Sequence, residues 1–179
     1  LLSFTGTDTI PAVLFLEEYY NANIELGLVG SSVPASEHSV MTSYGKEEEI
    51  TAFRRLLTQF PTGILSVVSD SFDLWKVCTE YLPLLKDQIL ARDGKLVIRP
   101  DSGDPVDIIC GTHIWESKEE WEEFNGVGST MRSEGKEGED WLECTPQEDG
   151  VVELLWEVFG GTVNEKGYKV LHPNIGVIY

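Results

Sequence analysis

Apolar and polar positions alternate along this chain with two different periods, which predict strands and helices in turn. Residues 47–60 carry apolar side chains every three or four positions and predict an amphipathic helix. Short β-branched runs at residues 64–69 (ILSVVS) and 95–98 (KLVI) predict buried strands. By the same patterns we expect further strands at 1–4, 31–33 and 175–178, helices at 12–20, 72–82, 84–91 and 151–159, and a hairpin over 162–170.

Two local signals set the limits of the helices that follow the first β-branched run. Asp70 and Ser71 are predicted to cap the helix of residues 72–82, since short polar side chains accept hydrogen bonds from first-turn amides. Pro83 is predicted to break that helix, because proline has no N–H to donate and its ring meets the preceding turn. Asp73 is interpreted as a first-turn carboxylate that faces the helix dipole.

Strands that alternate with helices at this spacing are typical of βα units, and they predict an α/β fold with a parallel sheet. About five strands are expected, which is too few to close an eight-stranded barrel. Polar and charged residues come directly after the strand ends, where barrels and open α/β folds place their chemistry.

Composition and charge restrict the classes of function. The chain has 179 residues, with 13 Lys and Arg against 31 Asp and Glu, and a net charge of −18. This excess argues against broad contacts with nucleic acid or an anionic membrane, although a small phosphorylated substrate in a local pocket stays compatible with it. No apolar run reaches the roughly 20 residues that cross a bilayer. The 3 widely spaced cysteines fit reduced thiols of a cytoplasmic protein better than a disulfide framework or a zinc site.

Residues 111–149 depart from the βα pattern and hold 12 acidic against 3 basic residues, a net charge of −9 that is half of the chain's total. Gly, Ser and Glu dominate there, with tryptophan and phenylalanine residues between them. We interpret this stretch as a solvated, partly disordered surface insertion. A loop that docks a partner protein through its aromatic residues is the alternative.

Four clusters at predicted strand ends contain the candidate residues for chemistry: Asp8, Glu37 with His38, Asp70, and Arg99 with Asp101. Each also fits an ordinary structural role when it is taken singly. An aspartate after a strand is often a helix cap, a lone histidine is often a surface or core residue, and Arg99 with Asp101 fits a structural ion pair. Because the strands of a barrel end at one mouth, we expect the four clusters to converge.

Convergent carboxylates with one histidine and one arginine suit a reaction at a phosphorylated sugar. Carboxylates stabilise developing positive charge on the sugar or hold its hydroxyl groups, directly or through Mg²⁺, while arginine and histidine meet anionic or carbonyl oxygens. A glycosidase that works with paired carboxylates would show a similar set, so this chemistry alone leaves both classes open.

Four motifs resemble those of a known family, in that family's order and at nearly its spacing. They are residues 6–9 (GTDT), 32–39 (SVPASEHS), 66–71 (SVVSDS) and 98–103 (IRPDSG), with weaker matches at 58–60 and 167–171. On these residues the chain resembles the nicotinamide phosphoribosyltransferase family over 1–109 and about 166–178. The resemblance implies a partial (β/α) TIM-like barrel of the type II phosphoribosyltransferases, with 1–179 as part of one domain and 111–149 as an insertion.

This family joins nicotinamide to phosphoribosyl pyrophosphate, which gives nicotinamide mononucleotide and pyrophosphate for NAD salvage. It uses Mg²⁺, and it uses ATP through transient phosphorylation of a histidine. The resemblance implies that His38 is that histidine, and that Glu37 orients it or helps to activate it. It also implies that Asp70 and Asp101 act at the ribose and metal side, with any metal contact made indirectly, through substrate or water.

For substrate binding, the resemblance assigns Arg99 to the nicotinamide pocket and Ser66 to the pocket wall near the amide. It also counts Ser32 among the substrate-binding residues. Asp8 would accept a hydrogen bond from the carboxamide of nicotinamide. Nicotinate would place a second carboxylate against Asp8, and a close pair of like charges in a pocket is costly. Asp8 is therefore the residue that predicts nicotinamide rather than nicotinate.

The resemblance carries three further expectations. Family members form homodimers with shared active sites, and their chains have an additional N-terminal region. They continue after the last strand with a Gly-Asp-Gly turn and a glycine-rich phosphate-binding loop, which would lie beyond Tyr179, so residues 1–179 alone are expected to be inactive. The alternatives are a nicotinate or other pyridine phosphoribosyltransferase of the same fold, and an inactive remnant that only binds a nucleotide or a partner.

Overall fold

The computed structural model describes residues 6–7, 9–112 and 145–179, and it divides into two compact units, Leu1–Pro34 and Ala35–Tyr179. In the first unit, α1 (Ile10–Tyr20) has a proline in its first turn and confirms the predicted helix. Gly6 and Ser31 form an isolated parallel bridge, so the strand expected at 31–33 is reduced to a single pair. The strand expected at 1–4 lies outside the described residues.

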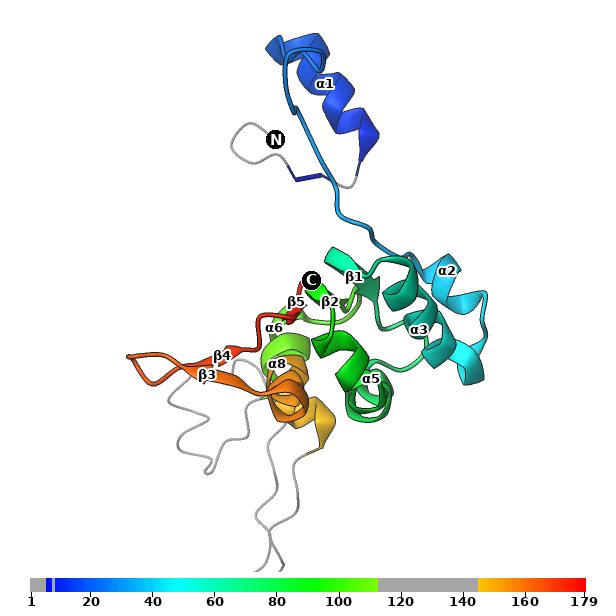
Figure 1. Ribbon diagram of the computed structural model, residues 1–179, viewed down its shortest axis with the longest axis vertical. Coiled ribbons are helices and arrows are strands. Elements are labelled where there is room, and N and C mark those ends of the chain that lie inside the picture. Colours follow the sequence, from blue (N-terminus) through cyan, green and yellow to red (C-terminus); the bar gives the residue numbers. More distant parts are fainter. Residues whose placement is uncertain (1–5, 8, 113–144) are drawn as a thin grey trace, which may run out of the picture. The chain divides into compact units, whose positions relative to one another are not determined.

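The second unit contains a parallel sheet with the strand order β1-β2-β5 (Figure 1). Its strands are β1 (Thr62–Val68), β2 (Asp93–Arg99) and β5 (Ile175–Val177). Ala35 adds a single parallel bridge to Ser66 on β1. The parallel α/β arrangement that the sequence predicts is confirmed.

The side chains on one face of this sheet pack into the hydrophobic core. Leu65 and Val67 of β1 pair with Leu96 and Ile98 of β2, and all four side chains are fully buried. On the opposite face Ile64 is 47% exposed. The remaining core side chains come mainly from the helices α3 (Glu49–Gln59), α5 (Leu82–Leu90) and α8 (Pro146–Phe159).

The helical segment after β1 runs on through Pro83, so the predicted break at this proline is wrong. Leu82 donates its N–H to the carbonyl of Val77, five residues back, in place of the usual four. This wider turn accommodates the proline, which has no N–H for the regular pattern. The segment consists of α4 (Leu74–Lys76), the π turn η2 (Val77–Tyr81) and α5 (Leu82–Leu90).

The cap of this segment also differs from its prediction. Asp73, rather than Asp70 or Ser71, accepts the first-turn hydrogen bond, from the Lys76 amide at 3.1 Å. A cap has to precede the first helical residue directly, and the helix begins at Leu74 instead of at residue 72. Asp70 and Ser71 are consequently left to make other contacts.

Among the described residues, the sequence pattern did not predict two short helices or the start of a third helix at residue 146. The two short helices are α2 (His38–Thr42) and α6 (Pro105–Cys110). α8 starts at Pro146 behind a capping box formed by Thr145 and Glu148, so the last residues assigned to the insertion 111–149 are the first turn of a helix. Residues 113–144 lie outside the described part of the chain.

The two segments that flank residues 113–144 meet backbone to backbone. Thr112 donates its N–H to the Gln147 carbonyl at 3.3 Å. Gly111 and Gly150 both have positive φ, and an added Cβ on Gly150 would lie 2.1 Å from the Gly111 nitrogen. This close approach is possible only for glycine, and it joins α6 to α8.

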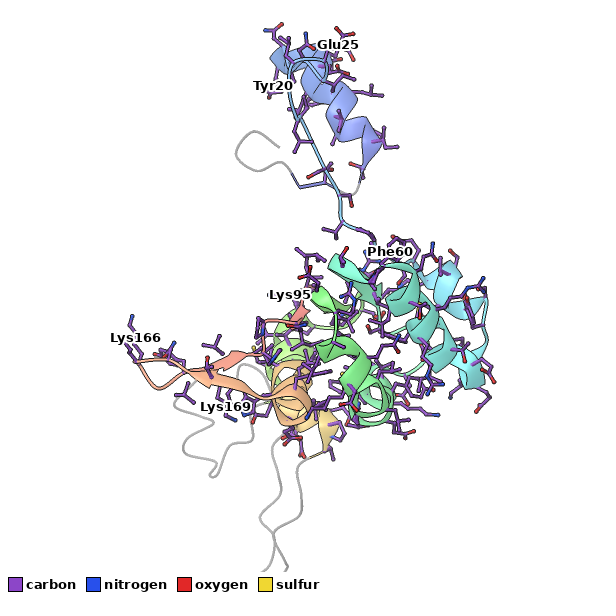
Figure 2. The ribbon with its side chains drawn as sticks, viewed as in Figure 1. Tyr20, Glu25, Phe60, Lys95, Lys166 and Lys169 are labelled. Carbon is purple, nitrogen blue, oxygen red and sulfur yellow. The ribbon has the colours of Figure 1, made fainter. Side chains whose placement is uncertain are left out.

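The hairpin predicted for residues 162–170 is confirmed by the antiparallel pair β3 (Gly161–Val163) and β4 (Lys169–Leu171). Lys166 lies at its tip (Figure 2). Lys169 pairs with Glu153 of α8 and lies 5.5 Å from the centre of the Trp156 ring, which fastens the hairpin to that helix. No helix among the described residues combines the length and the apolar character of a membrane span.

Candidate functional site

The residues before His38 are fixed against the edge of β1 by one buried serine. Ser36 donates its N–H to the Ser66 carbonyl at 3.0 Å, and its Oγ accepts from the Val68 N–H at 3.0 Å. Both bonds are made near the carboxyl end of the strand. The helix α2 then starts at His38, which brings its ring to the strand ends.

Asp70 joins the ends of β1 and β2. The strand pairing continues one step further through the Ser69 N–H and the Arg99 carbonyl, 2.9 Å apart. Oδ2 of Asp70 then accepts from the Asp101 N–H at 2.9 Å and from the Ser102 hydroxyl at 2.6 Å. The side chain is only 7% exposed, and its Oδ1 is buried with no hydrogen-bond partner in the described residues.

The ring of His38 lies among three side chains from the two strand ends. Nδ1 is 3.0 Å from Oγ of Ser71, while Nε2 is 3.4 Å from Asp101 Oδ2 and 3.8 Å from Asp70 Oδ1. The carboxylates thus face Nε2, while Nδ1 is hydrogen-bonded to the serine hydroxyl, which can donate to an unprotonated nitrogen or accept from a protonated one. The predicted convergence of His38, Asp70 and Asp101 is therefore present in the structure.

Arg99 and Glu37 form a pair of their own beside this group. Nη2 of Arg99 donates to the Ser36 carbonyl at 3.2 Å and to Glu37 Oε2 at 3.3 Å, and its Nε is buried without a partner in the described part of the chain. The Glu37 carboxylate thus contacts the Arg99 guanidinium, and its expected role in orienting or activating His38 stays a prediction. The alternative ion pair of Arg99 with Asp101 does not occur among the ion pairs of the described residues.

Sequence reasoning missed the serines that complete the site. Ser71 and Ser102 each follow an aspartate at a strand end. Ser71 is hydrogen-bonded to the His38 ring, and Ser102 donates to Asp70. The repeated Asp-Ser pair at the two strand ends is the signal that predicts them. Because Asp73 caps the helix, the hydroxyl of Ser71 is available for His38.

The other predicted binding residues are placed less fully. Ser66 lies in β1 and is buried, 7% exposed. Ser32 belongs to the first unit, where its hydroxyl donates to the neighbouring Val33 carbonyl. Asp8 lies outside the described residues. The binding roles of all three stay predictions.

A buried carboxyl group lies under the site, on the inner face of α3. Glu49 is 1% exposed, and its Oε1 has no partner among the residues described. Burial raises the pKa of this group from 4.5 to about 7, and the negative charges of Asp73 and Asp70 add to the increase, against the smaller opposing effect of Lys76. The sequence pattern did not predict that Glu49 is buried. Apolar residues usually occupy such a position on the inner face of a helix.

Glu49 predicts a pH dependence of folding stability. Between pH 4.5 and 7 the folded protein holds a proton on Glu49 that the unfolded chain has lost, so stability falls as the pH rises through this window. Relative to wild type, Glu49→Gln should therefore gain stability with pH, by about 1–3 kcal/mol at pH 8. Urea unfolding of both proteins at pH 5, 6, 7 and 8 measures this difference. Glu47→Gln, an exposed neighbour, is the control; a constant difference between Glu49→Gln and wild type would contradict the prediction.

The arrangement has the groups needed for transfer chemistry at an anionic substrate. The half-exposed ring of His38 lies against the carboxylates of Asp70 and Asp101, and the Asp70 carboxylate is held by hydrogen bonds. Asp70 Oδ1 and Arg99 Nε are buried polar atoms of opposite charge without partners in the described residues, and such atoms are those that a ligand satisfies. Among the described residues, no three His, Cys, Asp or Glu side chains are gathered so as to hold a metal ion by themselves.

Similarity to known proteins extends over the whole chain. A family model described as the nicotinate phosphoribosyltransferase (NAPRTase) family matches residues 1–179. The nicotinamide phosphoribosyltransferase of Acinetobacter baylyi is 44% identical over 100% of this chain and 31% of its own length. Those of Mycoplasma pneumoniae and Xanthomonas campestris pv. campestris are 37% and 36% identical, over 99% and 96% of this chain and 35% and 28% of their own lengths. The chain thus spans about a third of the length of these relatives.

Proposed function

The chain belongs to the nicotinate phosphoribosyltransferase family, and we propose that it forms the central part of a nicotinamide phosphoribosyltransferase of NAD salvage. The observation that carries the proposal is the position of His38, with Nε2 facing Asp70 and Asp101 where two parallel strands end. The choice of nicotinamide as the base is supported by the names of the relatives, all three of which are nicotinamide phosphoribosyltransferases.

In the proposed reaction, the ring nitrogen of nicotinamide attacks C1 of phosphoribosyl pyrophosphate. The bond from C1 to the pyrophosphate oxygen breaks, and its electron pair leaves with pyrophosphate. Asp70 and Asp101 stabilise the positive charge that develops on the ribose, and the carboxylate of Asp70 is fixed before the substrate arrives. Arg99 meets the base with the guanidinium edge that the protein leaves without a partner among the described residues.

We further propose that ATP assists by phosphorylating His38. In the reacting form of His38 one ring nitrogen has no proton and carries a lone pair. That lone pair forms the N–P bond with the γ-phosphoryl group, while the bond between this phosphorus and the bridging oxygen breaks and ADP leaves with the electron pair. The half-exposed ring, 46% accessible, allows a nucleotide to approach.

Mg²⁺ is the metal that these donors fit. Asp70 Oδ1 and the exposed carboxylate of Asp101 are hard oxygen donors, and two carboxylates are the usual protein share for Mg²⁺, which keeps waters or substrate phosphates as its other ligands. The ion would neutralise phosphate charge on the substrates. The protein's own contribution is to hold Asp70 in place through the Asp101 amide and the Ser102 hydroxyl.

The strand order supports the TIM-like barrel that the resemblance implies. The bridge at Ala35 and the strands β1, β2 and β5 lie side by side in chain order and are all parallel. This is the order of a barrel, whereas a doubly wound sheet reverses its order at a switch point. Ile64 is exposed on the sheet face opposite the core, as expected where further strands and side chains of a barrel would cover it. The homodimer and the cytoplasmic location stay predictions.

The proposal is tested with the complete protein that contains this chain. We expect it to form nicotinamide mononucleotide from nicotinamide and phosphoribosyl pyrophosphate with Mg²⁺, and to use nicotinate at least about 100-fold less well, since a like-charge pair in a pocket costs several kcal/mol. Asp8→Ser should narrow this difference. Equal turnover of both bases by wild type would favour a general pyridine phosphoribosyltransferase, and no turnover of either would favour an inactive remnant.

Phosphorylation is tested separately with ATP labelled at the γ-phosphate. We expect acid-labile label on wild type and none on His38→Ala, because no other described side chain occupies the same position between the two strand ends. His172, a half-buried histidine outside this site, provides the control, and His172→Ala should label as wild type does. Label that persists in His38→Ala would contradict the assignment.

A further inference from the structure

The orientation of the His38 ring depends on few contacts. The side chain is 46% exposed, so packing alone does not fix it. Its Nδ1 meets Oγ of Ser71 at 3.0 Å, across 33 positions of sequence. Ser71 makes no other side-chain hydrogen bond within the described residues, and Asp73 has taken over the helix cap that Ser71 would otherwise provide.

We propose that Ser71 is the positioning residue of His38, whose hydroxyl holds the ring in the orientation that keeps Nε2 against Asp70 and Asp101. This inference rests on the proposed function for its catalytic consequence, but the contact itself is independent of it. Ser71 acts through His38 and not on the substrate.

The physical reason is that the ring can rotate about its Cβ–Cγ bond. A rotation of about 180° exchanges the positions of Nδ1 and Cδ2 and those of Nε2 and Cε1. In the rotated orientation Ser71 would face a C–H group and its hydrogen bond with Nδ1 would be lost, so the hydroxyl favours the orientation in which Nε2 faces Asp70 and Asp101. A hydrogen bond of ordinary net strength favours one orientation by roughly 2- to 12-fold.

The test compares four forms of the complete protein: wild type, Ser71→Ala, Ser71→Thr and Ser43→Ala. Threonine keeps a hydroxyl at the same branch and should restore the contact that alanine removes. Ser43 is the matched control, because its hydroxyl donates to the Val40 carbonyl within the same helix region and does not contact the ring. Histidine labelled with ¹⁵N reports on the ring, and the His38 signals are assigned by their loss in His38→Gln.

In wild type the Nδ1 signal should be that of a nitrogen hydrogen-bonded to the Ser71 hydroxyl. We expect Ser71→Ala to move this signal to the position of an unbonded nitrogen or to split it, with Ser71→Thr and Ser43→Ala unchanged. With labelled ATP, the rate of His38 phosphorylation at saturation should fall about 3- to 10-fold in Ser71→Ala, the KM for ATP should stay within about twofold, and threonine should restore the rate.

The outcomes separate this inference from the proposed function. An Nδ1 signal that is the same in wild type and Ser71→Ala would overturn the role of Ser71, whatever the activity. A changed signal with an unchanged phosphorylation rate would overturn its catalytic consequence. An Nδ1 signal that differs between wild type and Ser71→Ala, together with no label from ATP on wild type, would support the positioning contact and refute the ATP coupling.

Discussion

Asp70→Asn is expected to lower the rate of nicotinamide mononucleotide formation by the complete protein about 10²- to 10³-fold, the range for loss of one preorganised charged group at a transition state. The substitution is isosteric. In wild type the Asp101 amide and the Ser102 hydroxyl both donate to Oδ2 of Asp70, and the amide oxygen of asparagine can still accept both hydrogen bonds. Its NH₂ group replaces the buried Oδ1 that faces Nε2 of His38, so the negative charge beside the ring is lost.

Asp73→Asn is the matched control for this prediction. It lies three residues further on and also loses one negative charge. Asparagine still caps a helix, so we expect a stability change of less than about 1 kcal/mol and a rate within about twofold of wild type. The measurements are kcat at saturating substrates and the urea midpoint of each variant. Equal losses of rate in the two variants would show that total charge, rather than the placement of Asp70, determines the rate.

The contrast between Asp70 and Asp73 also shows how far the sequence pattern determines this site. Both aspartates precede an apolar helical pattern, and the pattern alone does not determine which of them is the cap. The decision depends on where the helix starts, and in the structure Asp70 accepts hydrogen bonds from the loop after β2 while Asp73 caps the helix. Local propensity contains no information about a partner that lies 31 positions away.

Strand identity was predicted well because β-branched runs between turn residues rarely form anything but strands. The parallel pairing of β1 with β2, and hence the convergence of His38, Asp70 and Asp101, followed from that identity. The contact between Glu37 and Arg99 was not predicted. Glu37 is next to His38 in sequence, but neighbours in an extended segment point to opposite sides, and its carboxylate reaches Arg99 instead.

Pro83 and residues 146–149 show the same limit for helices. A proline is a local signal of a break, but a π turn on its N-terminal side accommodates it at little cost when both flanking segments are buried. The acidic composition of residues 146–149 predicted an insertion, whereas acidic residues are also what the first turn of a helix favours.

The second large effect is expected at the junction of α6 and α8. Gly150 has φ +75° inside α8, and an added Cβ would lie 2.1 Å from the Gly111 nitrogen and 2.6 Å from the Cys110 carbonyl carbon. Gly150→Ala therefore adds a backbone clash to an unfavourable backbone conformation, and we expect a loss of at least about 4 kcal/mol of unfolding free energy. The flexible end of a side chain could move aside at low cost, but here both obstructing atoms belong to the backbone of the facing segment.

A comparison with Gly45 separates the cost of the backbone clash at Gly150 from the cost of its strained conformation. Its backbone, at φ 77° and ψ 162°, nearly matches that of Gly150 at φ 75° and ψ 165°, but nothing lies within 4 Å of an added Cβ. Gly45→Ala should therefore cost only the conformational strain, about 1–3 kcal/mol. Urea unfolding of both variants measures the difference, which is the cost of separating Gly111 from Gly150. Equal losses would mean that the two segments yield easily, and that the contact between α6 and α8 does not hold the ends of residues 113–144 together.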